Sequence, residues 1–217
     1  MLLPLLAGTS AGSVDLVSIY ALKPRFQDLL RPLVRRLAGA GVTANQVTLL
    51  AAAISVALGL VLTLRPEQSS LFLLLPLLLF LRMALNAIDG MLAREFGQKS
   101  ALGAYLNELC DVVSDAFLYL PFAFQPHFDA TWVGVVIVLA VVSEMAGTVA
   151  VMTGASRRYD GPLGKSDRAF VFGALGLAIG LGLQPAPWIQ WLFPALALLL
   201  ALTIANRVRG GLAELRR

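Results

Sequence analysis

The chain contains few charged residues, one cysteine and one histidine. Asp, Glu, Lys and Arg account for 14% of its 217 residues, against about 25% in soluble domains. Hydrophobic residues account for 58%, and the mean hydropathy is +0.79. These values exclude a soluble globular enzyme and a disordered chain. The single cysteine, Cys110, excludes a disulfide framework or a Cys-rich zinc module, and we interpret it as a small apolar filler. The composition therefore indicates a membrane protein.

Six apolar stretches are long enough to cross a bilayer as helices, which takes about 20 mostly apolar residues. The predicted spans are residues 46–64, 71–94, 101–124, 131–153 and the two halves of the uncharged stretch 169–206, which Pro185-Ala186-Pro187 interrupts. The expected fold is an all-α integral membrane protein with six transmembrane helices.

The basic residues predict how these spans are oriented. The formal net charge is +4, and with a cytoplasmic amino terminus 15 of the 17 Lys and Arg residues lie on the cytoplasmic side. Membrane proteins typically carry this bias, so we assign the charge to topology and expect no nucleic-acid partner. Both termini are then cytoplasmic, as in a multi-pass protein of a bacterial inner membrane, an organelle membrane being the alternative. Trp132, Trp188 and Trp191 fall at the predicted outer interface, where aromatic residues gather.

Residues 19–38 predict a different kind of helix. Leu and Phe recur there at helical spacing with Lys and Arg between them. This pattern is typical of a cytoplasmic amphipathic helix lying on an anionic leaflet, the alternative being a solvated basic face. Pro32 is expected to kink or interrupt it. We expect residues 1–18 to be a poorly ordered leader, 19–210 to form a single membrane domain and 211–217 to be a cytoplasmic tail.

Polar side chains within spans two and three mark the expected site, because ionisable groups at membrane depth are costly and usually functional. Asn86 and Asp89 share one helix face, and Asn107 and Asp111 share a face of the next helix. With a rise of about 1.5 Å per residue, the four lie roughly 8–16 Å from the cytoplasmic ends of their spans. Their oxygens suit a hard divalent cation such as Mg²⁺, Mn²⁺ or Ca²⁺.

Arg82 lies deeper in span two than these four residues. We expect it to pair with one or both of Asp115 and Glu144 as a structural charge cluster. The alternative is that Arg82 belongs to an acceptor or headgroup pocket.

The polar positions also resemble the signature of a known family. Asn86, Asp89, Gly90, Ala93 and Arg94, then after eight residues Gly103, and then Asn107 and Asp111 at steps of four, resemble the CDP-alcohol phosphatidyltransferase signature D-x2-D-G-x2-A-R-x8-G-x3-D-x3-D. Six of the eight fixed positions and every spacing match, and the resemblance covers about residues 20–210. The family transfers a substituted phosphate from a CDP-linked donor to a hydroxyl acceptor and releases CMP. Its members are typically homodimers.

The resemblance implies a role for each matching residue. The implied ligands of Mg²⁺ or Mn²⁺ are Asn86, Asp89, Asn107 and Asp111, with Asp111 also the catalytic general base. The residues implied to hold the donor are Thr43, Asn45, Thr48, Gly90, Ala93, Arg94, Gly103, Lys165 and Arg168. The implied partners are membrane lipids and CDP-diacylglycerol or another CDP-alcohol. Each position also has a structural alternative: helix packing for the glycines, an N-cap for Thr43 or Asn45 and a positive-inside loop for Lys165 and Arg168.

The chain departs from the signature at Asn86 and Asn107, so two formal charges are missing from the site. The alternatives are one metal rather than two, weaker metal binding, or a non-catalytic member that acts as a membrane scaffold. We expect an active transferase with CDP-diacylglycerol as donor, rather than a phosphotransferase from a soluble CDP-alcohol to diacylglycerol or a small transporter. Arg157 and Arg158 are candidates for binding a phosphate-bearing acceptor, with topological charge as the alternative.

Overall fold

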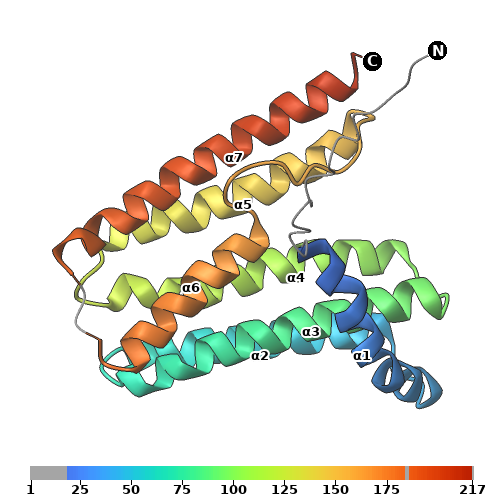
Figure 1. Cartoon of the computed structure of the whole chain (residues 1–217), viewed down its shortest axis with the longest axis horizontal. Coiled ribbons are helices and arrows are strands. Elements are labelled where there is room, and N and C mark those ends of the chain that lie inside the picture. The colour runs from blue at the N-terminus through green and yellow to red at the C-terminus, as the bar shows by residue number, and fades with distance from the viewer. Residues whose placement is uncertain (1–18, 184–185, 217) are drawn as a thin grey trace, which may run out of the picture.

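The computed structural model describes residues 19–183 and 186–216, and this part of the chain is helical with no strand (Figure 1). The predicted leader, residues 1–18, lies outside the described residues. The elements are α1 (Ile19–Gly39), α2 (Ala44–Leu64), η1 (Ser69–Leu73), α3 (Leu74–Glu95), α4 (Ala101–Tyr119), η2 (Leu120–Phe124), α5 (Ala130–Met152), α6 (Lys165–Gly180), η3 (Pro187–Trp191) and α7 (Leu192–Glu214). Here η marks a short 3-10 helix.

Helices lie where the apolar stretches predict them, and four are long and apolar enough to cross a membrane. These four are α2, Ser69–Glu95, α5 and Pro187–Glu214. Two predicted spans are not among them. The helix α4 carries Glu108, Asp111 and Asp115 within its length, and α6 has only 16 residues. The chain is therefore an all-α multi-pass membrane protein with four candidate spans among its described residues.

The outer surface of the bundle is apolar, as lipid requires. Leu77 and Phe80 on α3 are 67% and 63% exposed, and Val138 on α5 and Leu198 on α7 are 60% and 63% exposed. Such a surface would be unfavourable in water, and it matches the hydrocarbon interior of a bilayer.

The helix predicted for residues 19–38 is present as α1. Of the two outcomes expected at Pro32, a kink or an interruption, the interruption does not occur, because the helix continues through this exposed residue to Gly39. Val34 is fully buried, and the ring of Phe26 meets Phe80 of α3 edge to face at 6.3 Å. Leu33, in contrast, remains 46% exposed. One side of α1 thus packs on α3 while apolar residues remain on its free surface.

Two close contacts pack α4 against its neighbours near its carboxyl end. A Cβ on Gly59 of α2 would lie 2.3 Å from the carbonyl oxygen of Phe117, so α2 and α4 approach closely only because this residue is glycine. Further along α4, the ring of Tyr119 stacks on Phe172 of α6 with centroids 3.7 Å apart. These contacts fix α4 between α2 and α6.

The last helix extends beyond its predicted end. The helix α7 continues to Glu214, so the first four residues of the expected tail, 211–217, are helical. It lies alongside α5 for most of its length (Figure 1).

Candidate functional site

A cleft of about 550 Å³ opens among α2, α3 and α4. Its lining residues are Ala44, Asn45, Thr48, Asp89, Gly90, Ala93, Arg94, Gln98, Lys99, Ser100, Gly103, Ala104, Asn107 and Glu108. One wall therefore comes from the first turns of α2, and the other from the end of α3, the turn after it and the start of α4.

Local sequence signals explain why these helices begin and end at the cleft. Thr43 caps α2 in a capping box with Gln46, and Ser100 caps α4 by accepting a hydrogen bond from the Gly103 amide at 2.9 Å. Gly97 adopts φ +68°, a left-handed conformation that favours glycine and allows the chain to turn after α3. These three signals place the amino ends of α2 and α4 beside the carboxyl end of α3.

The side chain of Gln98 ties that turn to α2. Its carbonyl oxygen accepts a hydrogen bond from the Ala44 amide at 2.7 Å, and its amide donates to the Val42 carbonyl at 3.3 Å. Gln98 lies within the eight variable positions of the signature, so the sequence carried no direct indication of this role.

Small residues in the cleft allow polar side chains to approach the backbone. The guanidinium of Arg94 lies over Gly90, where an added Cβ would stand 2.9 Å from it. The side-chain oxygen of Asn45 lies equally close to where a Cβ on Gly103 would be, at 2.9 Å. Both glycines therefore allow close polar contact at the cleft.

The four predicted metal ligands occupy one region. Asp89 is buried and accepts a hydrogen bond from the Thr48 hydroxyl at 2.7 Å, and Asn107 lines the same cleft. Asn86 donates to the Asp111 carboxylate at 3.3 Å, and the carboxylates of Asp89 and Asp111 lie near enough to repel each other.

This set of donors fits one hard divalent cation. Across residues 19–183 and 186–216, no three His, Cys, Asp or Glu side chains come together as a metal site. The region supplies the carboxylates of Asp89 and Asp111 and the side-chain amides of Asn86 and Asn107, whose oxygens are the kind of donor that a hard divalent cation takes. The amide oxygens of Asn86 and Asn107 complete the donor set without adding charge.

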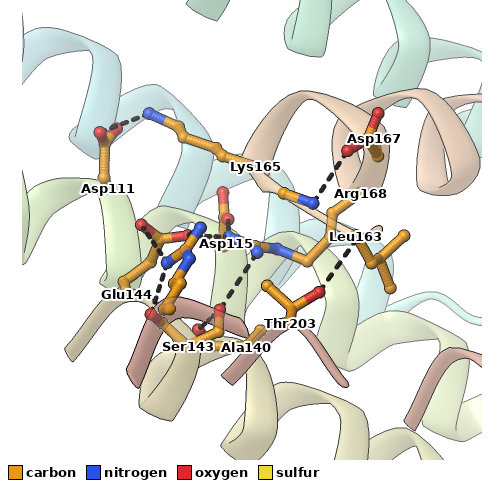
Figure 2. Close-up of polar contacts among 12 residues, drawn as sticks. Asp111, Asp115, Ala140, Ser143, Glu144, Leu163, Lys165, Asp167, Arg168 and Thr203 are labelled. Carbon is orange, nitrogen blue, oxygen red and sulfur yellow. Dashed lines mark hydrogen bonds and ion pairs between the residues drawn. The ribbon is translucent and has the colours of Figure 1, made fainter. Parts of the chain in front are cut away.

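Asp111 is already held by cations from two other helices. Lys165, the first residue of α6, forms an ion pair with one of its oxygens, as Figure 2 shows. Arg82 of α3 reaches the other oxygen at 3.1 Å. Lys165 reaches this depth because the loop after α5 runs back along the bundle, and α6 begins near its middle (Figure 1). The Asp111 side chain retains 21% exposure.

A second, more deeply buried charge cluster lies next to Asp111. The predicted pairing of Arg82 with Asp115 is confirmed, at 2.5 Å. Asp115 also accepts from Arg168 at 3.1 Å, and Arg168 donates to Glu144 at 2.9 Å. Glu144, the other acid expected to pair with Arg82, pairs with different arginines, among them Arg207 at 3.4 Å. Figure 2 shows Asp115, Arg168 and Glu144 pointing toward one another from α4, α6 and α5.

Arg157 and Arg158, the candidates for an acceptor phosphate, both lie in ion pairs. Arg157 pairs with Glu108 of α4 and, at 3.5 Å, with Glu144 of α5. Arg158 contacts Asp160 through two hydrogen bonds, and these lower the pKa of that carboxyl.

The loop that carries these arginines is packed tightly against α5 and α7. A Cβ on Gly147 would lie 2.6 Å from the Arg158 carbonyl oxygen. Gly161 has φ +126° and lies against Thr203, whose hydroxyl accepts a hydrogen bond from the Leu163 amide.

The structure brings most of the predicted donor-binding residues together. Those that line the cleft are Asn45, Thr48, Gly90, Ala93, Arg94 and Gly103. Three lie elsewhere: Thr43 caps α2, Lys165 holds Asp111, and Arg168 is buried among acids. Residues that sequence reasoning missed are Ala44, Gln98, Lys99, Ser100, Ala104 and Glu108 in the cleft. Of the polar members, Gln98, Lys99 and Ser100 lie in the variable stretch between Arg94 and Gly103, where the signature gives no indication, and only Glu108 directly follows a signature residue, Asn107.

The fold and the cleft together define a helical membrane protein with an oxygen-lined site beside a group of buried ion pairs. A sequence model of the CDP-alcohol phosphatidyltransferase family matches residues 41–204. The chain belongs to this family.

Individual relatives support the same assignment. The chain is 48% identical over 196 residues to the inner membrane protein YnbA of Escherichia coli strain K12, covering 89% of this chain and 96% of the relative. It is similar in fold to phosphatidylinositol phosphate synthase (PgsA1) of Mycobacterium tuberculosis in complex with manganese and citrate. That match has a TM-score of 0.67 and 24% identity, and covers 83% of this chain and 87% of the other. The same enzyme with CDP-DAG bound gives a TM-score of 0.58 and 25% identity, covering 85% and 90%.

Proposed function

We propose that this protein transfers a phosphatidyl group from CDP-diacylglycerol to a hydroxyl acceptor and releases CMP. The observation that carries the proposal is the cleft, in which signature residues of α3 and α4 line one space of about 550 Å³ together with Asn45 and Thr48 of α2. The similarity to a synthase with CDP-DAG bound supports this choice of donor.

In the proposed reaction, different residues bind the donor and transfer the proton. Arg94 and Lys99 bind the donor phosphates, while Asn45 and Thr48 contact the nucleotide across Gly90 and its neighbours. A divalent cation, Mg²⁺ or Mn²⁺, held by Asp89 and Asp111 with Asn86 and Asn107, neutralises charge on the pyrophosphate when it is bound.

Asp111 is the general base of the proposed reaction. The acceptor oxygen forms a bond to the phosphorus of the phosphatidyl group as the bond to CMP breaks, and Asp111 takes the proton from the acceptor hydroxyl. Ion pairs with Lys165 and Arg82 fix the direction of this carboxylate. Positioning and charge neutralisation supply most of the rate enhancement in such transfers.

The same proposal includes the membrane topology. The helices α4 and α6 complete a set of six spans, and α1 lies on the cytoplasmic leaflet with its exposed apolar residues toward lipid. Both termini are cytoplasmic. The homodimer that the family resemblance implies stays a prediction.

The test is CMP release from radiolabelled CDP-diacylglycerol by the purified chain in detergent, with Mg²⁺ or Mn²⁺ and a pool of hydroxyl acceptors. We expect metal-dependent CMP that Asp111→Asn abolishes. Asp129→Asn is the matched control, because this residue caps α5 at the other end of the bundle and asparagine caps equally well. CDP binding without CMP release from any pool would favour a non-catalytic scaffold.

A further inference from the structure

The cleft has two cations that no acid neutralises. Arg94 and Lys99 line it, and neither forms an ion pair with any acid in the part of the chain that the structure describes. Both lie at the end of α3 or in the turn after it. Two free cations suit the pyrophosphate of a CDP-linked donor.

Three arginines of the loop after α5 and of α7, Arg157, Arg158 and Arg207, are paired with acids. Arg157 bridges Glu108 of α4 and Glu144 of α5. Arg207 of α7, which is 2% exposed, also pairs with Glu144 at 3.4 Å. Each of these arginines therefore already has a carboxylate in contact.

Arg158 is neutralised in the same way. It contacts Asp160 at 2.7 Å and Glu214 of α7 at 2.8 Å. Two acids thus hold one arginine, and the pair with Asp160 is bidentate.

Glu108 lies close to Asp111, the base of the proposed reaction. It lines the cleft and precedes Asp111 by three residues on α4, so both lie near the reacting end of the cleft. A phosphate on the acceptor would have to displace Glu108 from Arg157. It would then lie beside the released carboxylate, and such contacts between like charges exclude a ligand.

Binding of a metal would leave these pairs intact. The acids concerned are Glu108, Glu144, Asp160 and Glu214, and none is among the four residues proposed to hold the cation. A cation bound at Asp89 and Asp111 would therefore leave Arg157 and Arg158 paired with the same acids.

We infer that the acceptor is an uncharged alcohol or polyol without a phosphate group, and that Glu108 and Glu144 exclude phosphorylated acceptors by occupying Arg157. The inference rests on the proposed transferase function and adds the substrate class. It assigns Glu108 and Glu144 to acceptor specificity, a role separate from metal binding or proton transfer.

The first test compares matched acceptors with the wild-type chain. Glycerol is paired with sn-glycerol 3-phosphate, and inositol with inositol 1-phosphate, and kcat/KM is measured from CMP release. We expect the unphosphorylated member of at least one pair to exceed its phosphorylated partner by about tenfold or more. Equal or higher kcat/KM for the phosphorylated members would overturn the inference.

The second test measures binding of radiolabelled sn-glycerol 3-phosphate at equilibrium, without catalysis. Wild type should bind it weakly, and Glu108→Gln, which releases Arg157 from the nearer of its two acid partners, should bind it about tenfold more tightly. Glu95→Gln is the matched control, since Glu95 does not line the cleft and its replacement removes an ion pair with Arg31 of similar exposure, 35% for Glu95 against 31% for Glu108. Tight binding to wild type, or no gain in Glu108→Gln, would contradict the inference.

The two tests also separate this inference from the proposed function. Absence of CMP with every acceptor would refute the transferase. The assignment of an acceptor class would then be refuted as well. The binding measurement would still show whether Glu108 prevents phosphate from binding.

Discussion

Asp115 and Asp111 lie one turn apart on α4, and the same substitution should have opposite consequences at the two positions. Asp115 is 5% exposed and receives hydrogen bonds from Arg82 and Arg168, which are themselves 4% and 1% exposed. Removing one partner of a buried ion pair costs about 3–5 kcal/mol, because the remaining charge is left uncompensated. Asparagine retains one acceptor oxygen, so we expect Asp115→Asn to lower the free energy of unfolding by about 3 kcal/mol, the lower end of that range.

This loss should be visible as a lower melting temperature. For a chain of this size, 1 kcal/mol corresponds to about 2–4 °C, so Asp115→Asn should melt about 6–12 °C below wild type. The assay is the thermal loss of the monodisperse peak in size-exclusion chromatography of detergent-solubilised protein.

Asp111→Asn provides the matched comparison. The buried Arg82 keeps Asp115 as its partner when Asp111 is replaced, and the other pair, of Asp111 with Lys165, is partly solvated, with side chains 21% and 34% exposed. Such pairs contribute about 0–1 kcal/mol, so the melting temperature should fall by less than about 4 °C while CMP release is lost. The reasoning is refuted if Asp115→Asn melts within about 2 °C of wild type, or if Asp111→Asn is destabilised as strongly.

Two further predictions concern helix packing and pH. Gly59→Ala should lower the melting temperature, because the new methyl group would lie 2.3 Å from a carbonyl oxygen of α4. Gly134→Ala, which meets nothing within 4 Å, should be neutral or slightly stabilising, and equal effects of the two would contradict the packing argument. Arg158 lowers the pKa of Asp160 below its ordinary value of 3.8, so their pair stabilises the loop 153–164 above that pH. This stabilisation is lost as the pH falls through the lowered pKa, so amide exchange in the loop, corrected for intrinsic rates, should rise at pH 3 relative to pH 6. Asp160→Asn should remove that pH dependence, and an unchanged pH response in the variant would assign it to another group.

The helices and much of the cleft were predictable from the sequence for identifiable reasons. Apolar stretches of about 20 residues form helices in a membrane because every backbone polar group there must be hydrogen-bonded internally. The spacing of Asp89, Gly90, Ala93 and Gly103 placed them on facing helical surfaces, and all four line the cleft. Arg82 was expected to find an acid at its own depth because an unpaired charge in the membrane is costly, and it pairs with Asp115.

Other features depended on contacts between distant segments. The depth of Lys165 follows from the loop after α5, which is held by Gly147 and by Thr203 of α7, and no local pattern predicts that path. The pairing of Glu144 with Arg157, Arg168 and Arg207 joins α5, its following loop, α6 and α7.

The sequence by itself determined the helical membrane class, the positions of the helices and the oxygen donors on α3 and α4, because periodicity and hydropathy are local properties of the chain. The tertiary structure decided which charges neutralise one another. Arg157 and Arg94 are both basic residues near predicted span ends, and only the packing of α4 against α5 gives Arg157 the partner Glu108 while leaving Arg94 open to the cleft. Ion pairs depend on distances across helices that are far apart in sequence, and those distances exist only after the bundle has packed.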